Sequence, residues 1–389
     1  MNLIFVSNYY NHHQSAVSKA FFELTNQNYL FIATSEMPSF RKELGYNNGQ
    51  LPKFVLQANS LEKEDEAKKL ILEADVVIYG SAPYKFIKDR IKEKKITFAY
   101  SERIYKKKWQ LSEIPLRFLK YLFCGATKNN HYLLCASAYA YADYQKTFCF
   151  TNRAFKWGYF PVVKKYDNVE KLIENKDPTS ILWVARLIEW KHPDASILVA
   201  EKLKKAGYHF KLNLIGNGVM ETEIAEMIKN KNLEDCVSML GAMSPEKVRI
   251  HMEKSQIFLF TSDFNEGWGA VLNESMNSGC AVVASHAIGS VPFLINNGEN
   301  GLIYKNGDID DLYNKVKFLL DNPERCKVMG KYAYKKLADD WNAEVATQRF
   351  MNLAESLLND KRVDELYFSG PCSKAKKLKN MWYKNEKNN

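Results

Sequence analysis

The sequence predicts an α/β protein that is built from two doubly wound domains in tandem. The length of 389 residues exceeds what one hydrophobic core usually serves. An apolar share of 46%, with 13% aromatic residues, is enough for two buried cores. Short apolar runs alternate with longer amphipathic runs, which is the pattern of βαβ units around a parallel sheet.

The first domain is expected over residues 1–163. Its strands are predicted at residues 3–7, 29–33, 76–79, 96–100 and 133–136. A helix is expected over residues 15–25, and the loop before it carries His12 and His13. Because ligands bind at the carboxyl ends of parallel strands, His13 is a candidate for binding or proton transfer. Capping or packing of the helix is the alternative.

The second domain is expected over residues 164–341, behind a polar hinge at residues 164–179. Its strands are predicted at residues 181–185, 211–215, 237–240, 257–261, 281–284 and 302–304. Residues 342–389 are expected to add a helix at 343–358 and a basic tail. Two such sheets in tandem form a cleft, so we expect the active site in this inter-domain cleft and closure about the hinge.

Charge and cysteine content narrow the class of protein. The net charge of +10 favours an anionic partner, but no nucleic-acid recognition motif accompanies it. The seven cysteines are scattered and lack metal-ligand spacing, so we expect reduced thiols and no metal site. No apolar run suits a signal peptide or a membrane span, which predicts a cytoplasmic, soluble protein.

The most informative segment is SDFNEGWGAVLNESMNSG, residues 262–279. It leaves a predicted strand, turns through the glycine pair at 267 and 269, and enters a helix that carries Glu274. Small residues in the turn let backbone N–H groups approach a ligand, and a helix start favours phosphate. Glu266 and Glu274 could both reach a ligand over this helix start, which suits a sugar nucleotide. A capped helix after a core strand is the alternative.

Three further strand ends carry polar or small residues. Arg186 follows one strand and Lys191 starts the next helix, so both cations could converge on a diphosphate. A solvated surface pair is the alternative reading. The other two strand ends carry Gly216, Asn217 and Gly218, and Ala242 and Met243. All these features share one edge of one sheet and form a coherent site.

In these residues the chain resembles the retaining GT-B glycosyltransferases of family four, also called glycosyl transferases group 1. The family has a motif of two Glu residues separated by seven residues, and Glu266 and Glu274 match it here. The family also has an Arg and a Lys in the first loop of the second domain, and Arg186 and Lys191 match these. The resemblance covers residues 180–320. It implies two Rossmann-like domains, a C-terminal helix that returns to the first domain, and sugar transfer with retention at the anomeric carbon.

The resemblance also implies roles for the matched residues. Arg186 and Lys191 would neutralise the leaving diphosphate, Glu266 would contact the transferred sugar, and Glu274 would bind the ribose. The donor would also meet backbone groups of Gly267, Trp268, Gly269 and Ala270 and, near its base, of Ala242 and Met243. No metal and no cofactor is expected, since the two cations serve the leaving group.

The first domain departs from the family pattern. Residues 8–14 read NYYNHHQ where relatives carry a glycine-rich loop. The strand predicted at 96–100 ends in Glu102 and Arg103, where relatives often place a histidine. Glu102 is a candidate base for the acceptor, and Arg103 could bind an anion. A salt-bridged loop is the alternative.

Residues 106–123 form a basic and aromatic amphipathic stretch. It begins with Lys106, Lys107, Lys108 and Trp109 and continues into an apolar helical pattern. Such stretches lie at anionic membrane surfaces, and ordinary packing on the first domain is the alternative.

These observations predict a glycosyltransferase that uses a nucleotide-diphosphate sugar and a glycan or lipid-linked acceptor. Cell-surface polysaccharide or lipopolysaccharide synthesis is the expected pathway, with the protein at the inner face of the membrane. A sugar-nucleotide epimerase of GT-B architecture and a catalytically silent nucleotide-sugar-binding protein are the alternatives.

Overall fold

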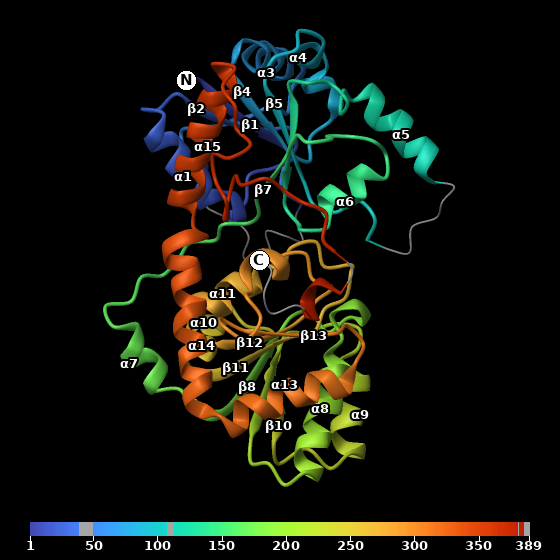
Figure 1. Cartoon of the computed structure of the whole chain (residues 1–389), viewed down its shortest axis with the longest axis vertical. Coiled ribbons are helices and arrows are strands. Elements are labelled where there is room, and N and C mark those ends of the chain that lie inside the picture. The colour runs from blue at the N-terminus through green and yellow to red at the C-terminus, as the bar shows by residue number, and fades with distance from the viewer. Residues whose placement is uncertain (39–49, 107–112, 380, 385–389) are drawn as a thin grey trace. The chain divides into compact units, whose positions relative to one another are not determined.

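The computed structural model describes residues 1–38, 50–106, 113–379 and 381–384, and the chain divides into two compact units. Unit 1 comprises Met1–Val162 and Trp341–Leu378, and unit 2 comprises Val163–Asp340 and Lys379–Asn389 (Figure 1). Each unit is a parallel sheet between helices, so the doubly wound α/β class predicted from the sequence is confirmed.

The described residues of unit 1 form a seven-stranded sheet in the order β3-β2-β1-β4-β5-β6-β7, and the strands pair in parallel. The strands are β1 (Leu3–Ser7), β2 (Tyr29–Ala33), β3 (Val55–Gln57), β4 (Val76–Tyr79), β5 (Thr97–Ser101), β6 (His131–Cys135) and β7 (Ala154–Lys156). Every residue of β1 is buried, because helices cover both faces of a parallel sheet. The sequence did not predict β3 and β7, which are edge strands of three residues each.

The helices of unit 1 are α1 (His12–Leu24), α3 (Leu61–Glu73), η2 (Tyr84–Phe86), α4 (Lys88–Lys92), α5 (Glu113–Phe123), α6 (Ala140–Gln145) and α15 (Ala343–Leu358). Helix α1 begins three residues earlier than predicted. The Asn11 side chain accepts the N–H of His13, and Gln14 accepts that of Asn11, which is a capping box. His12 and His13 therefore lie in the first helical turn and not in a loop.

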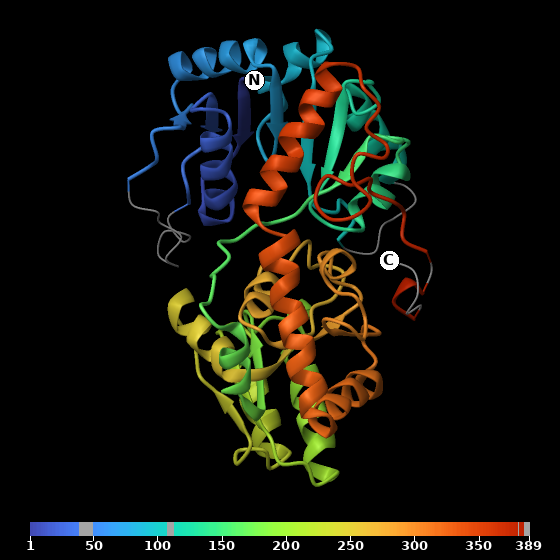
Figure 2. The same ribbon diagram turned by 60° about the vertical axis from the view of Figure 1, so that its left-hand side comes forward.

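Helix α15 completes the core of unit 1 by packing beside α1 (Figures 1 and 2). The Phe350 ring lies 5.3 Å from that of Phe21 in α1 and 4.9 Å from that of Phe98 in β5. Asn342 caps the helix by accepting the N–H of Val345 at 2.8 Å. The C-terminal helix is thus part of unit 1.

The segment after α15 differs from the predicted polar tail. Cys372 N–H donates to Lys156 O at 2.8 Å, and Ala375 N–H donates to Ala154 O at 3.0 Å. Lys374 pairs antiparallel with Phe155, and Cys372 is buried. The reason is that β7 is an edge strand whose free backbone groups need partners, and residues 372–375 supply them.

The described residues of unit 2 form a six-stranded parallel sheet in the order β10-β9-β8-β11-β12-β13. The strands are β8 (Asp177–Val184), β9 (Lys211–Ile215), β10 (Val237–Met239), β11 (Ser255–Phe260), β12 (Ala281–Ser285) and β13 (Leu302–Tyr304). The helices are α7 (Val169–Glu174), η3 (Glu189–Lys191), α8 (Pro193–Lys205), α9 (Glu221–Asn230), α10 (Pro245–Lys254), α11 (Val271–Asn277), α12 (Val291–Leu294), α13 (Ile309–Asp321), α14 (Pro323–Lys335), η4 (Lys336–Asp340) and η5 (Trp382–Lys384).

Three observations on the described residues bear on the sequence predictions. The segment predicted as a polar hinge contains α7, which Asn168 caps by accepting the N–H of Lys171 at 2.8 Å. The sequence analysis did not predict this short helix, because the segment is mostly polar.

The seven cysteines, all in described residues, are free thiols, and five of them are buried. Within the described ranges, no helix has the length and apolar character needed to cross a membrane.

Candidate functional site

The loops at the carboxyl edge of the unit 2 sheet carry the residues singled out in the sequence. The loop after β8 is fixed against the end of β11. Thr261 Oγ1 lies 2.7 Å from Lys191 O, and Asp263 N–H donates to Trp190 O at 3.1 Å. The buried indole of Trp183 donates to the same Thr261 hydroxyl at 2.8 Å. These bonds join two loops that lie more than 60 residues apart in the sequence.

At this junction Lys191 forms an ion pair with Glu266. The Lys191 ammonium bonds Glu266 Oε2, and the side chains are only 12% and 9% exposed. Ser262 Oγ donates to the same oxygen at 3.0 Å, and the ammonium lies 4.3 Å from the centre of the Trp190 ring. Removing one partner of such a pair would strand the other charge in a poorly solvated place. An anionic ligand would compete with Glu266 for Lys191.

Arg186 is exposed, and its guanidinium makes neither an ion pair nor a hydrogen bond within the described part of the chain. The loop that carries Arg186 is held in place by the turn that follows β9. Leu187 N–H donates to Asn217 O at 2.8 Å, and Gly216 N–H donates to Gly241 O at 2.9 Å. A Cβ at residue 216 would collide with Ala185 O, so only glycine permits this approach.

Glu274 lies in the first turn of α11, where its carboxyl group is partly buried. Desolvation raises its pKa above the ordinary value of 4.5, and the Arg249 guanidinium opposes that rise. Arg249 reaches this helix from α10 and donates to Glu274 O at 3.2 Å and to Asn277 Oδ1 at 3.0 Å. Sequence reasoning missed Arg249, because nothing in its own helix marks it as a neighbour of Glu274.

The turn between β11 and α11 is shaped by Gly269 and Trp268. Gly269 has φ +84°, and a Cβ there would collide with the Phe260 ring. The Trp268 side chain is fully buried and donates to Asn273 Oδ1 at 2.9 Å. Trp268 was predicted as a donor-binding residue, and only its backbone can fill that role. Gly267 and Ala270 flank these two residues in the same turn.

Ala242 and Met243 lie in the loop between β10 and α10, at the same edge of the sheet. Ala242 is exposed and Met243 is half-buried. Ser244 then caps α10, where the sequence placed the helix start.

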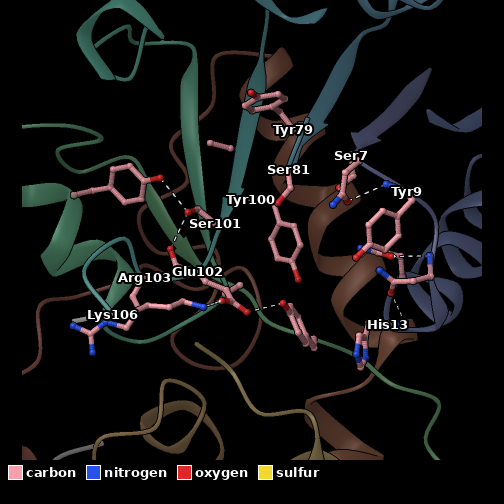
Figure 3. Close-up of a pocket in the computed structure, with 18 residues that line it drawn as sticks. Ser7, Tyr9, His13, Tyr79, Ser81, Tyr100, Ser101, Glu102, Arg103 and Lys106 are labelled. Atoms are coloured by element: carbon pink, nitrogen blue, oxygen red, sulfur yellow. Dashed lines mark hydrogen bonds and ion pairs between the residues drawn. The ribbon is translucent and has the colours of Figure 1, made fainter. Parts of the chain in front are cut away.

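Unit 1 contains a polar pocket of about 460 Å³ at the carboxyl ends of its own strands (Figure 3). Residues from β1, β4 and β5 and from the start of α1 line it, and so do five tyrosines, Tyr9, Tyr79, Tyr100, Tyr144 and Tyr159. Burial raises the pKa of Tyr79 to about 12, and burial also raises the pKa values of Tyr100 and Tyr144. These three phenols stay protonated at neutral pH, and they donate to Ala82 O at 2.5 Å, to Gly158 O at 3.2 Å and to Ser101 Oγ at 3.0 Å, respectively.

Glu102 stands in this pocket between two partners. Its Oε1 accepts the Tyr159 hydroxyl at 2.6 Å, and its Oε2 accepts the Lys106 ammonium at 2.5 Å (Figure 3). The His13 ring stacks on the Tyr159 ring with centroids 5.3 Å apart. The two predicted candidates, Glu102 and His13, are thus joined through Tyr159. Sequence reasoning missed Tyr159, which lies 57 residues from Glu102.

Arg103 is the other residue singled out at this strand end. It pairs with the buried carboxylate of Asp143 at 3.4 Å and lies over the Tyr139 ring at 5.1 Å. The salt-bridged arrangement, left open from the sequence, is therefore the one present for Arg103. Of the basic stretch predicted to begin at Lys106, residues 107–109 lie outside the described residues, and α5 covers its apolar part.

Comparisons with known proteins point to one family. The family model described as "Glycosyl transferases group 1" matches residues 164–336. A poly(ribitol-phosphate) alpha-N-acetylglucosaminyltransferase of Staphylococcus aureus is 29% identical over 174 residues, covering 44% of this chain and 34% of its own length. The amylovoran biosynthesis glycosyltransferase AmsK of Erwinia amylovora is 29% identical over 185 residues, covering 46% and 45%. The matched part spans less than half of each of these relatives.

Solved structures match most of the chain. Anabaena Alr3699/HepE in complex with UDP aligns with a TM-score of 0.68 and 13% identity over 92% of this chain and 100% of its own. TarM aligns with a TM-score of 0.65 and 14% identity over 92% and 99%. At these identities the likeness concerns the fold alone. Residues 164–336 therefore match the model of the glycosyl transferases group 1 family, and the chain has the GT-B fold of two doubly wound domains.

Proposed function

We propose that the chain is a retaining glycosyltransferase. It would move a sugar from a nucleotide-diphosphate sugar to a hydroxyl of a glycan or lipid-linked acceptor. The observation that carries this proposal is the meeting of Lys191 and Glu266 at the carboxyl edge of unit 2, inside the segment that matches the family model. The proposal divides the substrates between the units, with the donor on unit 2 and the acceptor in the pocket of unit 1.

On the donor side, Lys191 and Arg186 would neutralise the diphosphate as the bond to the sugar breaks. Preorganised charges of this kind are usually the largest single term in catalysis. Arg186 is exposed, and Lys191 would exchange its bond with Glu266 for one with phosphate. Glu266 would then be released to position the sugar. Glu274 would accept hydrogen bonds from the ribose, and the two cations let the leaving group depart without a metal or cofactor.

On the acceptor side, the tyrosine-lined pocket offers aromatic faces that suit a sugar ring. Glu102 is the proposed base or positioning group for the acceptor hydroxyl. Both of its oxygens are engaged by Tyr159 and Lys106, so an acceptor hydroxyl would have to displace one of them. His13 lies against Tyr159 and is the second candidate for proton transfer. Attack would come from the same face that the diphosphate leaves.

The pathway proposed is cell-surface polysaccharide or lipopolysaccharide synthesis, with the protein at the inner face of the membrane. Relatives named for poly(ribitol-phosphate) modification, amylovoran synthesis and colanic acid synthesis support this class of acceptor. So does a relative named as an undecaprenol-linked N-acetylgalactosaminyltransferase of Campylobacter jejuni, 33% identical over 159 residues.

The test is nucleoside diphosphate release from UDP-, GDP- and ADP-sugars, with and without a lipid-linked acceptor extract. Arg186→Ala and Lys191→Ala should abolish release, whereas Lys211→Ala should not, because Lys211 is exposed at the amino end of β9. NMR of the product should report retention, and chelation of divalent metals should leave the rate unchanged.

An inverted product would contradict the retaining mechanism. Donor-induced thermal stabilisation without release would favour the silent binder, and interconversion of two sugar nucleotides would favour the epimerase.

A further inference from the structure

Helix α5 presents large apolar side chains to solvent. Leu116 is 73% exposed and Phe123 is 77% exposed, with Leu119 at 47% and Leu122 at 40%. Leu116, Leu119 and Phe123 recur at helical spacing and share one face of the helix. Figure 1 shows α5 at the edge of unit 1. An exposed apolar strip of this kind marks an interaction surface.

The opposite face of α5 already has its packing partners. The Tyr121 ring lies 5.0 Å from the Tyr144 ring, and the Arg117 guanidinium lies 4.7 Å from the centre of the Tyr105 ring. The exposed strip is therefore not the face that holds the helix to unit 1.

Phe123, at one end of this strip, lines a cavity of about 440 Å³ together with four lysines. The lysines are Lys88, Lys92, Lys94 and Lys128. Lys92 pairs with Asp89 at 3.3 Å, while Lys88, Lys94 and Lys128 are exposed and make no ion pair with any described residue. The cavity thus combines unneutralised positive charge with an apolar rim.

Local packing fixes the cavity in place. A Cβ at residue 125 would collide with the Ile91 side chain, so Gly125 lets the end of α5 approach α4. The Tyr84 hydroxyl donates to Phe123 O at 2.9 Å and ties the end of α5 to η2. The lysines therefore come from two chain segments held against each other.

We propose that this surface docks the protein on a bilayer that contains anionic lipids. The lysines of the cavity would bind lipid phosphate groups, and Leu116, Leu119 and Phe123 would enter the acyl region. The positive charge of this surface favours an anionic bilayer over a second copy of the chain as the occupant. A symmetric contact would place the unpaired lysines of both copies together, where like charges repel. The docking is separate from sugar transfer, so it can be tested without turnover.

The experiment is flotation of the full chain with vesicles of phosphatidylcholine alone or with one third phosphatidylglycerol. The protein should float with the anionic vesicles at low salt, stay behind with the neutral ones, and be released by high salt. The triple variant Lys88→Gln/Lys94→Gln/Lys128→Gln should weaken binding to anionic vesicles about a hundredfold, because each lysine near such a surface contributes about fivefold. Leu116→Ser/Phe123→Ser should also weaken binding to the anionic vesicles at low salt, where the wild type binds.

Matched controls lie in the same unit. Lys19, Lys63 and Lys69 are exposed lysines elsewhere on unit 1, and Leu61 and Phe368 are 85% and 94% exposed. Lys19→Gln/Lys63→Gln/Lys69→Gln and Leu61→Ser/Phe368→Ser should bind as the wild type does. Equal binding to neutral and anionic vesicles, or equal loss in the controls, would overturn the proposal. So would a dimer that Leu116→Ser/Phe123→Ser dissolves while vesicle binding is unchanged.

Discussion

At the scale of single residues, the donor side of the site depends on the pairing of Lys191 with Glu266. The two side chains neutralise each other where water is largely excluded, and Ser262 adds a third contact. A ligand that recruits Lys191 must therefore supply a negative charge of its own. Glu266, once released, needs hydroxyl donors, and a sugar has them. The pair is suited to a ligand that combines phosphate with a sugar.

A double-mutant cycle tests this pairing. Lys191→Ala should destabilise unit 2 by about 3 kcal/mol, because it leaves the Glu266 carboxylate unpaired in a poorly solvated place. Adding Glu266→Gln should restore most of that loss, since no charge then remains. Chemical denaturation of the four proteins measures both effects. Equal and additive losses would show that the two side chains are not coupled.

Glu274 gives a prediction for pH dependence. Desolvation raises its pKa above 4.5 in the folded protein, so the folded state holds this proton more tightly than the unfolded state does. Stability therefore declines as pH rises from 4.5 through the raised pKa. Glu274→Gln should become more stable than the wild type over that interval, with a constant difference above it, and should bind the donor more weakly. The measurement is the unfolding free energy of both proteins from acid to neutral pH. A stability difference between Glu274→Gln and the wild type that does not grow as pH rises would contradict this prediction.

At the scale of elements, long buried strands were predictable and short edge strands were not. The strands β1, β2 and β4 stand at the predicted residues, because four or five consecutive apolar residues mark a buried strand. The edge strand β7 has three residues and becomes stable only by pairing with β6 and with residues 372–375. Composition gave no hint of that pairing.

The candidate site likewise has features that were predictable from the sequence and features that were not. Positions at strand ends were predictable, because parallel strands place their carboxyl ends at one edge. The partner of each residue was not predictable, because it depends on tertiary packing. Glu266 meets Lys191 across 75 residues, and Glu102 meets Tyr159 across 57. The start of α1 was missed because its cap is Asn11, ahead of the two histidines.

The pairing of residues 372–375 with β7 can be tested directly. Ala375→Pro removes the N–H that bonds Ala154 O, and it should destabilise unit 1 by about 1–3 kcal/mol because that carbonyl loses its partner. Lys376→Pro is the control, because Lys376 is exposed and its N–H makes no backbone bond in the described residues. Reaction of Cys372 with a thiol reagent reports the same change, since the buried thiol should become accessible in Ala375→Pro alone.

At the scale of the whole molecule, the chain consists of two units that each have a sheet and a core. Separate cores predict two unfolding transitions in calorimetry. A donor that binds only unit 2 should raise one of them and leave the other in place, because ligands stabilise only the fold that binds them. A UDP-sugar that shifted neither transition would contradict donor binding, and one that shifted both equally would contradict its confinement to unit 2.

Acid should lower the unit 1 transition, because unit 1 contains the buried His131 at the start of β6. Burial lowers the pKa of His131 to about 4, from 6.5, so the folded unit resists a proton that the unfolded chain accepts. The resulting stability is present above pH 6.5 and is lost as pH falls toward 4, in total about 3 kcal/mol. His131→Leu should remove this part of the pH dependence from the unit 1 transition alone. If the variant and the wild type lose stability in parallel between pH 7 and pH 4, His131 is not the group that makes unit 1 acid-sensitive.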